Sequence, residues 1–383
     1  MADVGISSIA GYLPRLRLSK NSIAQANAWL APNLVGKGKG TRAMANWDED
    51  SVTMSVEAIR RILGENDDRS HVDSLFFAST TMPFSDRLNS GIIRAALTLE
   101  EETECIDIGS TLKSGTSALI QALDKVKSGN SNYSIVSVAD KRKARAASPQ
   151  ELDFGDASVA LSVDSDNLIA KYINSSSLSI DFIDHFRQPG EEFDYNWEER
   201  WIRDEGFLKI VPKAINDLFD KTNIDGSKID HFIIPSVFPR VDQMIAKKCG
   251  IDPDKVVNNM ALTVGNSGSA HALLMLASVL ETAKPGEKIL VCSFGNGSDA
   301  LLFETTDNIK SYKPFQTIES LIESGIEEYN YLKYLTFNDL IKWEKGMRGE
   351  QDRKTALTTL YRHNDAIMGL VGGKCSKTGT IQY

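Results

Sequence analysis

The sequence predicts a layered α/β fold assembled from two related halves. Strand-like runs rich in β-branched and aromatic residues alternate with amphipathic stretches along most of the 383 residues, which is typical of α/β proteins. A stretch that begins at Ser114 (SGTSALIQALDKV) recurs from Ser267 (SGSAHALLMLASV) with its apolar stripe in the same phase. These observations indicate a duplicated strand–helix–strand unit, although a chance likeness between two ordinary helix–strand units would look the same.

Each expected element follows from the periodicity of its segment. Short apolar runs predict buried strands, and apolar residues three and four positions apart predict helices. Strands are expected at 4–9, 74–79, 134–138, 231–235 and 288–294. Helices are expected at 50–63, 116–126 and 270–280.

Two further pairs of segments repeat in the same order. FGDASVAL at 154–161 and FGNGSDAL at 294–301 share Phe, Gly, Ser, Ala and Leu at the same positions. DSLFFAST at 73–80 mirrors DHFIIPSV at 230–237. Three elements that recur in one order support duplication of the unit.

In each half an apolar strand leads into a loop of small residues and then into a buried helix. The loops lie at 109–115 and 264–268. The N–H groups at a helix start favour an anion or a thiolate. We expect the two loops to face each other near a pseudo-twofold axis and to frame an active site.

Composition narrows the function classes. Hydrophobic residues make up 42% and charged residues 25% of the chain, an ordinary soluble composition. The net charge of -9 argues against a broad nucleic-acid surface. No apolar run reaches the ~18 residues that span a bilayer, and the start lacks a signal-peptide pattern. The scattered Cys105, Cys249, Cys292 and Cys375 suit reduced thiols, so we expect a cytoplasmic protein without a metal site.

Several motifs resemble the thiolase superfamily, within it the hydroxymethylglutaryl-CoA synthase and ketoacyl-ACP synthase III branch. They run in family order over about residues 4–306: YLPRLRLSKNSIA near the start, NWDEDSVTMSVEAIR (46–60), ELDFGDASVAL (151–161), DHFRQPGEEFDYNWEERW (184–201) and VGNSGSA (264–270). The resemblance implies a five-layer αβαβα fold, a homodimer, an acyl-CoA substrate and no covalently bound cofactor.

The resemblance also implies a division of the chain. We expect an N-terminal thiolase-like half at 1–168, a C-terminal half at 169–306 and a helical extension or linker at 307–371. The last segment, 372–383, resembles the start of a zinc ribbon that precedes an OB-fold. Thr378 stands where that pattern has its second Cys, so one thiolate cannot close a zinc site. Either the sequence stops before an OB-fold domain, or that domain has lost its metal. An accidental Cys in the tail is a further alternative, and the OB-fold could also be a separate subunit.

The catalytic positions depart from the family pattern. The resemblance places the family Cys at Leu112, the family His at Ser236 and the synthase Glu near Thr80, and only the Asn survives, as Asn266. A leucine cannot form an acyl-enzyme, because that step needs a thiolate or its equivalent. Cys105 lies upstream in a predicted strand, where we expect a structural thiol rather than a replacement nucleophile.

Four residues are candidates for catalysis. Asn266 would donate to a thioester oxygen, His271 would be a displaced general base, Ser236 would bind a substrate carbonyl, and the Ser298 N–H would be an oxyanion donor. Each has a structural alternative: a helix cap, a packed histidine, a small residue at a strand end and a plain tight turn. Lys113 would join Leu112 and Thr80 around the substrate, with a Schiff-base or an interface role.

Two basic groups are candidates for contacts with the CoA phosphates, where charge-assisted hydrogen bonds are strong. The first is Lys37, Lys39 and Arg42 in VGKGKGTR, and the second is Arg240, Lys247 and Lys248. Ordinary solvated charge explains them equally well.

Two readings remain open for the function. The fold binds an acyl-CoA and makes or breaks a C–C bond by aldol or retro-aldol chemistry on a 3-hydroxyacyl-CoA, without a covalent intermediate. Alternatively, the chain is a non-catalytic thiolase-fold subunit of an acyl-CoA complex. A standard hydroxymethylglutaryl-CoA synthase is a third reading, which the missing Cys, His and Glu oppose.

Overall fold

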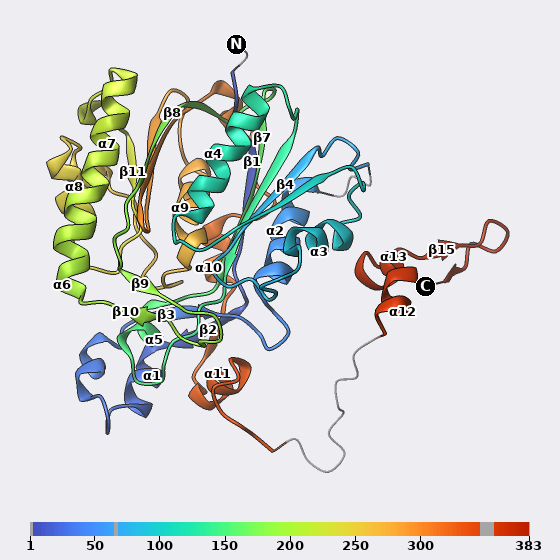
Figure 1. Cartoon of the computed structure of the whole chain (residues 1–383), viewed down its shortest axis with the longest axis horizontal. Helices are drawn as coiled ribbons and strands as arrows, with labels where there is room; N and C mark the ends of the chain where they lie inside the picture. The colour runs from blue at the N-terminus through green and yellow to red at the C-terminus, as the bar shows by residue number, and fades with distance from the viewer. Residues whose placement is uncertain (1–2, 65–67, 345–355, 383) are drawn as a thin grey trace.

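The computed structural model describes residues 3–64, 68–344 and 356–382. Its centre is a nine-stranded sheet in the order β11-β12-β13-β8-β1-β7-β6-β4-β5, with helices on both faces (Figure 1). The strands are β1 (Gly5–Tyr12), β4 (Ser74–Ala78), β5 (Glu104–Ile108), β6 (Ser134–Asp140), β7 (Ala157–Asp164), β8 (Ala170–Ser179), β11 (His231–Ile233), β12 (Lys288–Phe294) and β13 (Gly297–Thr305).

The pairing of strands follows the same pattern on each side of the sheet centre. On one side β4 and β6 are parallel and β6 and β7 are antiparallel. On the other side β11 and β12 are parallel and β12 and β13 are antiparallel. The first strands of the two sets, β1 and β8, are antiparallel neighbours. This repeat agrees with the duplication, while the boundaries at 168 and 306 stay a prediction.

Helices form three layers around the two halves of the sheet. The inner pair is α4 (Ser114–Lys127) and α9 (His271–Leu280), which share the largest core cluster. Outer helices α2 (Ser51–Leu63) and α3 (Asn89–Ala96) cover the first half. Outer helices α7 (Leu208–Thr222) and α8 (Val241–Lys248) cover the second half. The five-layer αβαβα arrangement is therefore present.

The expected elements agree with the observed ones to within a few residues. The strand expected at 231–235 ends early, at Ile233, because Pro235 leads into an irregular turn beside the site. The helix expected at 270–280 starts with a short 3₁₀ turn, η5 (Gly268–Ala270). Capping explains the sharp start of α2, since the Asp50 carboxylate accepts the Thr53 N–H at 2.8 Å.

A smaller layer lies at the lower end of the molecule in Figure 1. It holds the three-stranded sheet β14-β2-β3 and a two-stranded hairpin, β10-β9. The strands are β2 (Leu16–Ser19), β3 (Thr41–Met44), β9 (His185–Phe186), β10 (Tyr195–Asn196) and β14 (Ile326–Glu328). Other short helical segments along the whole chain are α1 (Lys20–Ala26), η1 (Pro32–Lys37), α5 (Pro149–Asp153), α6 (Glu199–Trp201), the π-helical η2 (Ile202–Phe207), η3 (Gly226–Lys228), η4 (Pro253–Lys255), η6 (Asp307–Lys310), α10 (Ile318–Glu323) and α11 (Tyr331–Phe337).

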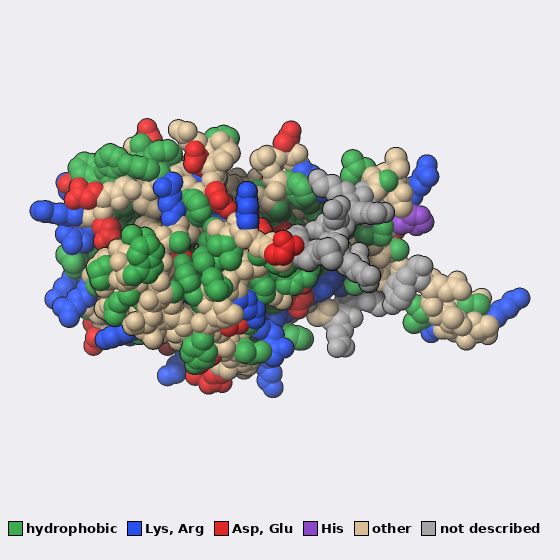
Figure 2. Space-filling model, turned by 90° about the horizontal axis from the view of Figure 1, so that it is seen from below, with side chains coloured by type: hydrophobic (Ala, Val, Ile, Leu, Met, Phe, Trp, Pro, Cys, Tyr) green, Lys and Arg blue, Asp and Glu red, His purple; other side chains and the backbone are tan. Residues whose placement is uncertain are grey.

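The C-terminal segment projects from one side of the main body (Figure 2). It contains α12 (Leu357–Arg362), α13 (Asn364–Met368) and a hairpin of β15 (Gly373–Lys374) and β16 (Ile381–Gln382). Gly369 packs closely on Thr98 at the end of α3. Within the extension or linker expected at 307–371, residues 345–355 lie outside the described residues.

Two kinds of feature are absent from the described residues. No described helix has the length and apolarity to cross a membrane. In the described ranges, no three His, Cys, Asp or Glu side chains lie together as metal ligands would. The Cys375 thiol is exposed at the tip of the C-terminal hairpin.

Candidate functional site

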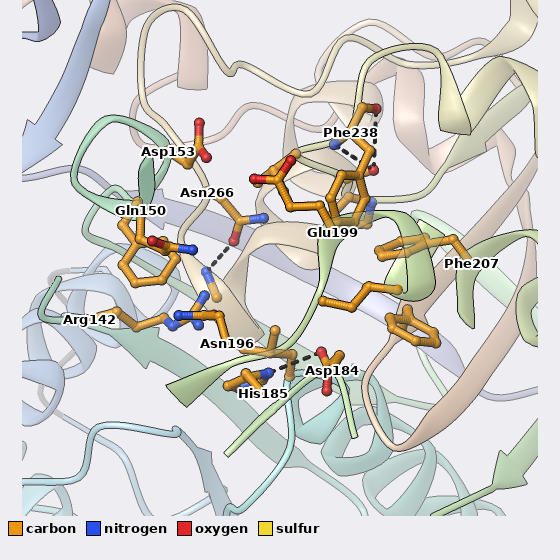
Figure 3. Close-up of a pocket in the computed structure, with 18 of the residues that line it drawn as sticks. Arg142, Gln150, Asp153, Asp184, His185, Asn196, Glu199, Phe207, Phe238 and Asn266 are labelled. Carbon is orange, nitrogen blue, oxygen red and sulfur yellow. Dashed lines mark hydrogen bonds and ion pairs between the residues drawn. The ribbon is translucent and has the colours of Figure 1, made fainter. Parts of the chain in front are cut away.

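A pocket opens between hairpin β9–β10, segment η2 and the C-terminal end of β12 (Figure 3). It contains about 840 Å³ of empty space, including its open mouth. Leu112, Ser236 and Asn266 all line it. The structure thus brings together the three positions to which the sequence resemblance assigned the family's Cys, His and Asn.

Hydrogen bonds hold the side-chain amide of Asn266 in one orientation. Its Oδ1 accepts the Gly268 N–H at 2.9 Å, so Nδ2, a donor, faces the pocket (Figure 3). Gly268 has φ +61, and a Cβ there would clash with Asp140. The Asn266 backbone is held as well, since its N–H donates to the Asp153 carbonyl at 2.7 Å. The loop therefore presents a single fixed donor to any ligand.

Leu112 lies just before α4, against the turn between β12 and β13. The Thr111 hydroxyl donates to the Gly295 carbonyl at 2.6 Å, and the Ser293 hydroxyl donates to the Leu112 carbonyl at 3.3 Å. A Cβ on Gly295 would come within 2.9 Å of the Leu112 nitrogen. No described residue accepts the Leu112 N–H. Leu112 therefore lines the pocket with an inert side chain, and its N–H, which lies against Gly295, is not paired by a described residue.

Ser236 caps the turn that follows β11. Its Oγ accepts the Phe238 N–H at 3.1 Å, and its carbonyl accepts Asn259 Nδ2 at 3.1 Å. The hydroxyl donates in turn to the Phe238 carbonyl at 3.5 Å. Ser236 therefore lies at the pocket wall with its hydroxyl bonded to the turn, and this position offers no imidazole.

Hairpin β9–β10 supplies polar groups that sequence reasoning did not single out. His185 pairs with Asn196 in its register, and both side chains line the pocket. The neighbouring pair, Phe186 and Tyr195, points outward with 42% and 52% exposure. This alternation is the ordinary consequence of a strand. The signal that could have found His185 is its place in the 184–201 segment that already resembled the synthases.

A buried carboxylate accompanies His185. Asp184 Oδ2 lies 3.0 Å from His185 Nδ1, and the Asp184 residue is 6% exposed. Its Oδ1 is buried without a hydrogen-bond partner among the described residues. A buried carboxylate in this state stabilises positive charge on its neighbour.

Ion pairs anchor the hairpin to the loop after β6. Asp194 lies 2.8 Å from Arg142 Nη2 and 2.7 Å from Arg187 Nη1. Burial raises the pKa of Asp194, but the charges of Arg142, His185 and Arg187 outweigh it and hold this pKa below its usual value. The Arg142 guanidinium also lies 3.8 Å from the ring centre of Phe154. The polar side of the pocket is therefore rigidly braced.

The opposite side of the pocket is apolar and aromatic. Phe207 packs on Phe294 with ring centres 4.4 Å apart and on Phe238 at 5.8 Å. A Cβ on Gly206 would clash with Phe294 and Phe182, so the π-helical segment η2 packs tightly there. The pocket can thus hold an apolar group at one end and hydrogen-bond a polar group at the other.

His271 does not line the pocket. Its Nδ1 accepts from Ser267, and its Nε2 donates to the Asn259 carbonyl at 2.8 Å. Burial lowers the pKa of His271 to about 4. Both ring nitrogens are occupied in a neutral buried ring, so we do not retain a general-base role for this residue.

Three further predicted site residues, Lys113, Ser298 and Thr80, do not line the pocket. Lys113 Nζ lies 2.9 Å from the buried Asp299. Ser298 is in the β12–β13 ladder, and its hydroxyl donates to the Ser293 carbonyl at 2.9 Å. The Thr80 N–H donates to Asp140 at 2.7 Å. None of the three lines the pocket, so each holds the surrounding loops.

The basic residues predicted for CoA divide into two kinds. Arg42 is 1% exposed, donates to the Glu151 carbonyl at 2.8 Å and stacks on Tyr334, so it cannot reach a phosphate in solvent. Exposed residues remain available: Lys37, Lys39, Arg240, Lys247 and Lys248. Lys37 acts electrostatically on the pocket residue Asp153. This group therefore includes one charge that acts on a residue of the pocket lining.

The four thiols do not approach the reactive centre. Cys105 is in edge strand β5, where burial raises its pKa to about 11. Cys249 and Cys292 are buried under α7 and α8. None of these thiols, nor the exposed Cys375, lines the pocket, so no described thiol could act as a nucleophile there.

Comparison with known proteins shows which proteins this chain is similar to. Residues 219–302 match the model for the 3-oxoacyl-[acyl-carrier-protein (ACP)] synthase III C terminal. The hydroxymethylglutaryl-CoA synthase of Caldivirga maquilingensis is 29% identical over 351 residues, covering 90% of this chain and 99% of the relative. The synthase of Methanosphaera stadtmanae is 26% identical over 345 residues, covering 88% and 99%.

Solved structures show the same fold. A hydroxymethylglutaryl-CoA synthase complexed with CoA superposes with a TM-score of 0.76 at 16% identity, covering 92% of this chain and 95% of that one. The 3-oxoacyl-(acyl carrier protein) synthase III of Pseudomonas aeruginosa PAO1 gives 0.70 at 16%, covering 79% and 98%. The chain therefore has the thiolase-like α/β fold and is similar to the hydroxymethylglutaryl-CoA synthases and 3-oxoacyl synthase III of that superfamily.

Proposed function

We propose that the protein binds an acyl-CoA in this pocket and makes or breaks a carbon–carbon bond without an acyl-enzyme. The observation that carries the proposal is the fixed Asn266 amide, whose Nδ2 faces a pocket with Leu112 at the nucleophile position. The similarity to hydroxymethylglutaryl-CoA synthases, one of them solved with CoA, supports the acyl-CoA part.

The chemistry that fits these groups is aldol or retro-aldol conversion of a 3-hydroxyacyl-CoA. Cleavage of its C2–C3 bond produces an enolate whose charge lies on the thioester oxygen. Asn266 Nδ2 and the Leu112 N–H are donors that would stabilise this oxygen. No thiolate is needed, which agrees with a leucine at the centre.

The CoA moiety would leave the pocket through its mouth. Two exposed cations are candidates to meet it: Lys37, whose charge acts on the lining residue Asp153, and Arg240, which follows the pocket residue Phe238 closely in sequence. These side chains would contact the diphosphate or the ribose phosphate. Arg42 is excluded from this role by its burial.

The test combines binding and turnover. Calorimetry with CoA and acetyl-CoA should give micromolar binding, and Asn266→Ala should weaken acetyl-CoA binding more than binding of free CoA, which lacks the thioester. A panel of 3-hydroxyacyl-CoA esters should then yield an acyl-CoA and a carbonyl product. Absence of binding at millimolar ligand would contradict the proposal.

A second candidate is a non-catalytic subunit of an acyl-CoA complex. It is favoured by the loss of ionisable side chains at both Leu112 and Ser236. In that case the isolated protein binds acyl-CoA but turns nothing over until a thiolase-fold partner with an intact Cys is added. A radiolabelled acyl-enzyme formed from acetyl-CoA would instead revive the synthase-type transferase.

We also propose the assembly that the resemblance implies. The chain would form a homodimer, which light scattering after size exclusion would detect. The hairpin around Cys375 would belong to a ribbon or OB-fold unit, in this chain or in a partner. Both follow from the resemblance alone.

A further inference from the structure

We propose that His185 is the catalytic base and acid of this pocket, with Asp184 as its positioning residue. The inference rests on the proposed function and names the proton carrier that function needs. The predicted candidate, His271, has both ring nitrogens bonded and lies outside the pocket. His185 lies in the pocket wall with Asn266 and Leu112.

The hairpin fixes where the imidazole lies. In the β9–β10 register His185 stands opposite Asn196, and both face the pocket while their neighbours point outward. The loop between the two strands is held by Asp194, which contacts Arg142 at 2.8 Å and Arg187 at 2.7 Å. A short hairpin held by one buried ion pair, Arg142–Asp194, and one exposed pair, Arg187–Asp194, keeps a catalytic side chain in place.

The neighbouring carboxylate fixes the ring and its charge. Nδ1 lies 3.0 Å from Asp184 Oδ2, which leaves Nε2 as the free nitrogen; the described residues give Nε2 no hydrogen bond. Figure 3 shows this contact beside the pocket. The charged groups facing the ring are Asp184, Asp194 and, through Asp194, Arg142 and Arg187. Two further carboxylates, Asp153 and Glu199, line the same pocket, so the ring lies among both acidic and basic side chains.

The proposed step balances without any further reactant. His185 Nε2 takes the proton of the 3-hydroxyl, and the O–H electron pair forms the C3 carbonyl. The C2–C3 bond breaks, and its electron pair becomes the thioester enolate, whose oxygen accepts from Asn266 Nδ2. The imidazolium then returns its proton to C2. The products are an aldehyde or ketone and a shortened acyl-CoA, and condensation is the same sequence in reverse.

The experiment uses two readouts on the full chain. One is cleavage of a 3-hydroxyacyl-CoA, and the other is exchange of the C2 protons of acetyl-CoA in D₂O, which needs the base but no bond cleavage. The variants are His185→Gln, Asp184→Asn and, as a control, the exposed and distant His71→Gln. Calorimetric binding of acetyl-CoA and thermal melting check that each variant is folded.

We expect His185→Gln to lower kcat and the exchange rate by about 10²–10⁴-fold while KM changes less than about threefold. Asp184→Asn should lower kcat by about tenfold or more, with acetyl-CoA binding unchanged. A further variant, His185→Gly, should regain part of its activity when imidazole is added. Added imidazole would not restore activity if His185 had only a structural role.

Three outcomes decide the matter. Cleavage by the wild type with His185→Gln within threefold of it overturns the base and leaves the proposed function standing. Exchange without cleavage that is lost in His185→Gln supports the base and contradicts the aldol substrate. A wild-type protein that neither exchanges nor cleaves overturns both.

Discussion

At the scale of single residues, the orientation of one amide decides what the pocket can stabilise. The Gly268 N–H holds Asn266 Oδ1 at 2.9 Å, so only Nδ2 can donate to a ligand. Asn266→Asp keeps the acceptor for Gly268 and removes the donor. We expect kcat to fall by ~10²-fold or more, because an oxyanion donor is replaced by a negative charge. Steady-state kinetics with melting curves would check this, and an unchanged kcat would remove Asn266 from the oxyanion site.

Thiol reactivity gives a second residue-scale prediction. Burial raises the pKa of Cys105 and of Cys249 to about 11 and that of Cys292 further, so these thiols stay protonated at neutral pH. Hydrogen bonds from Thr378 and its neighbour lower the pKa of the exposed Cys375. Iodoacetamide should therefore label the wild type once, at Cys375, as peptide mass spectrometry would show.

The same reagent tests the position of Leu112. In a Cys375→Ser background, Leu112→Cys places a thiol in the pocket at the start of α4, where the helix dipole favours a thiolate. We expect fast labelling that acetyl-CoA slows by occupying the pocket. Slow labelling in both conditions would mean that residue 112 does not face the acyl site.

The buried His271 predicts how stability depends on pH. Its pKa is about 4 in the folded chain against an ordinary value of 6.5, so the unfolded chain binds a proton first as the pH falls. Stability due to the neutral ring is complete above pH 6.5 and is lost towards pH 4, by about 3 kcal/mol. His271→Gln should flatten this part of the unfolding free energy profile relative to the wild type. Identical slopes in denaturant titrations would contradict the prediction.

At the scale of elements, buried aspartates hold the two loops that frame the pocket. Asp299 in β13 lies 2.9 Å from Lys113 Nζ and accepts from Thr116 at 2.9 Å and Ser117 at 2.7 Å, all at the start of α4. Lys113 was predicted as a substrate residue, and the structure gives it a partner across the halves instead. This ion pair therefore connects β13 to the loop before α4.

A double-mutant cycle measures this link. Lys113→Met leaves Asp299 buried without its cation and should destabilise the fold by about 3–5 kcal/mol. Asp299→Asn should cost a similar amount, and the double variant should cost less than the sum of the two. Additive effects in urea unfolding would show that the pair carries no coupling.

The sequence predicted regular elements better than it predicted the site. Periodicity located α2 and α4 because each buries one apolar stripe over more than three turns, whereas α9 is a shorter helix of ten residues that is buried on nearly all sides. Strands β9 and β10 are two residues each, which is too short for any periodic signal. The motif resemblance placed Leu112, Ser236 and Asn266 in one pocket, but the burial of His271 depends on Asn259, a partner outside its own helix.

At the scale of the whole molecule, the duplication explains why the pocket lies between the halves. Asp140, at the end of β6, accepts from the Ser269 N–H at 2.8 Å and from its hydroxyl at 2.7 Å. Asp299 makes the corresponding contacts in the opposite direction. Each half therefore holds the helix start of the other, and the loops bearing Leu112 and Asn266 cannot move independently.

The packing of the C-terminal segment predicts how much its removal changes the stability of the fold. None of the described residues of 356–382 is buried, and their packing is limited to α13 and Gly369 against the end of α3. Truncation after Glu344 should therefore change the unfolding free energy by less than about 1 kcal/mol, or about 2–3 °C in Tm. Truncation after Asn330 is the matched control, because it removes Tyr334, which is 1% exposed and stacks on Arg42.

That control should lower Tm by about 10 °C or more, since burial of an aromatic ring and its contact with a buried guanidinium contribute several kcal/mol. Both truncations remove residues from the C-terminus, but only the longer one removes the buried Tyr334. Calorimetry therefore distinguishes a peripheral segment from an element of the core. If truncation after Glu344 leaves Tm unchanged but weakens acyl-CoA binding, the C-terminal segment acts on the pocket and not on the fold. If it lowers Tm as far as the control does, the C-terminal segment is part of the core and this prediction is wrong.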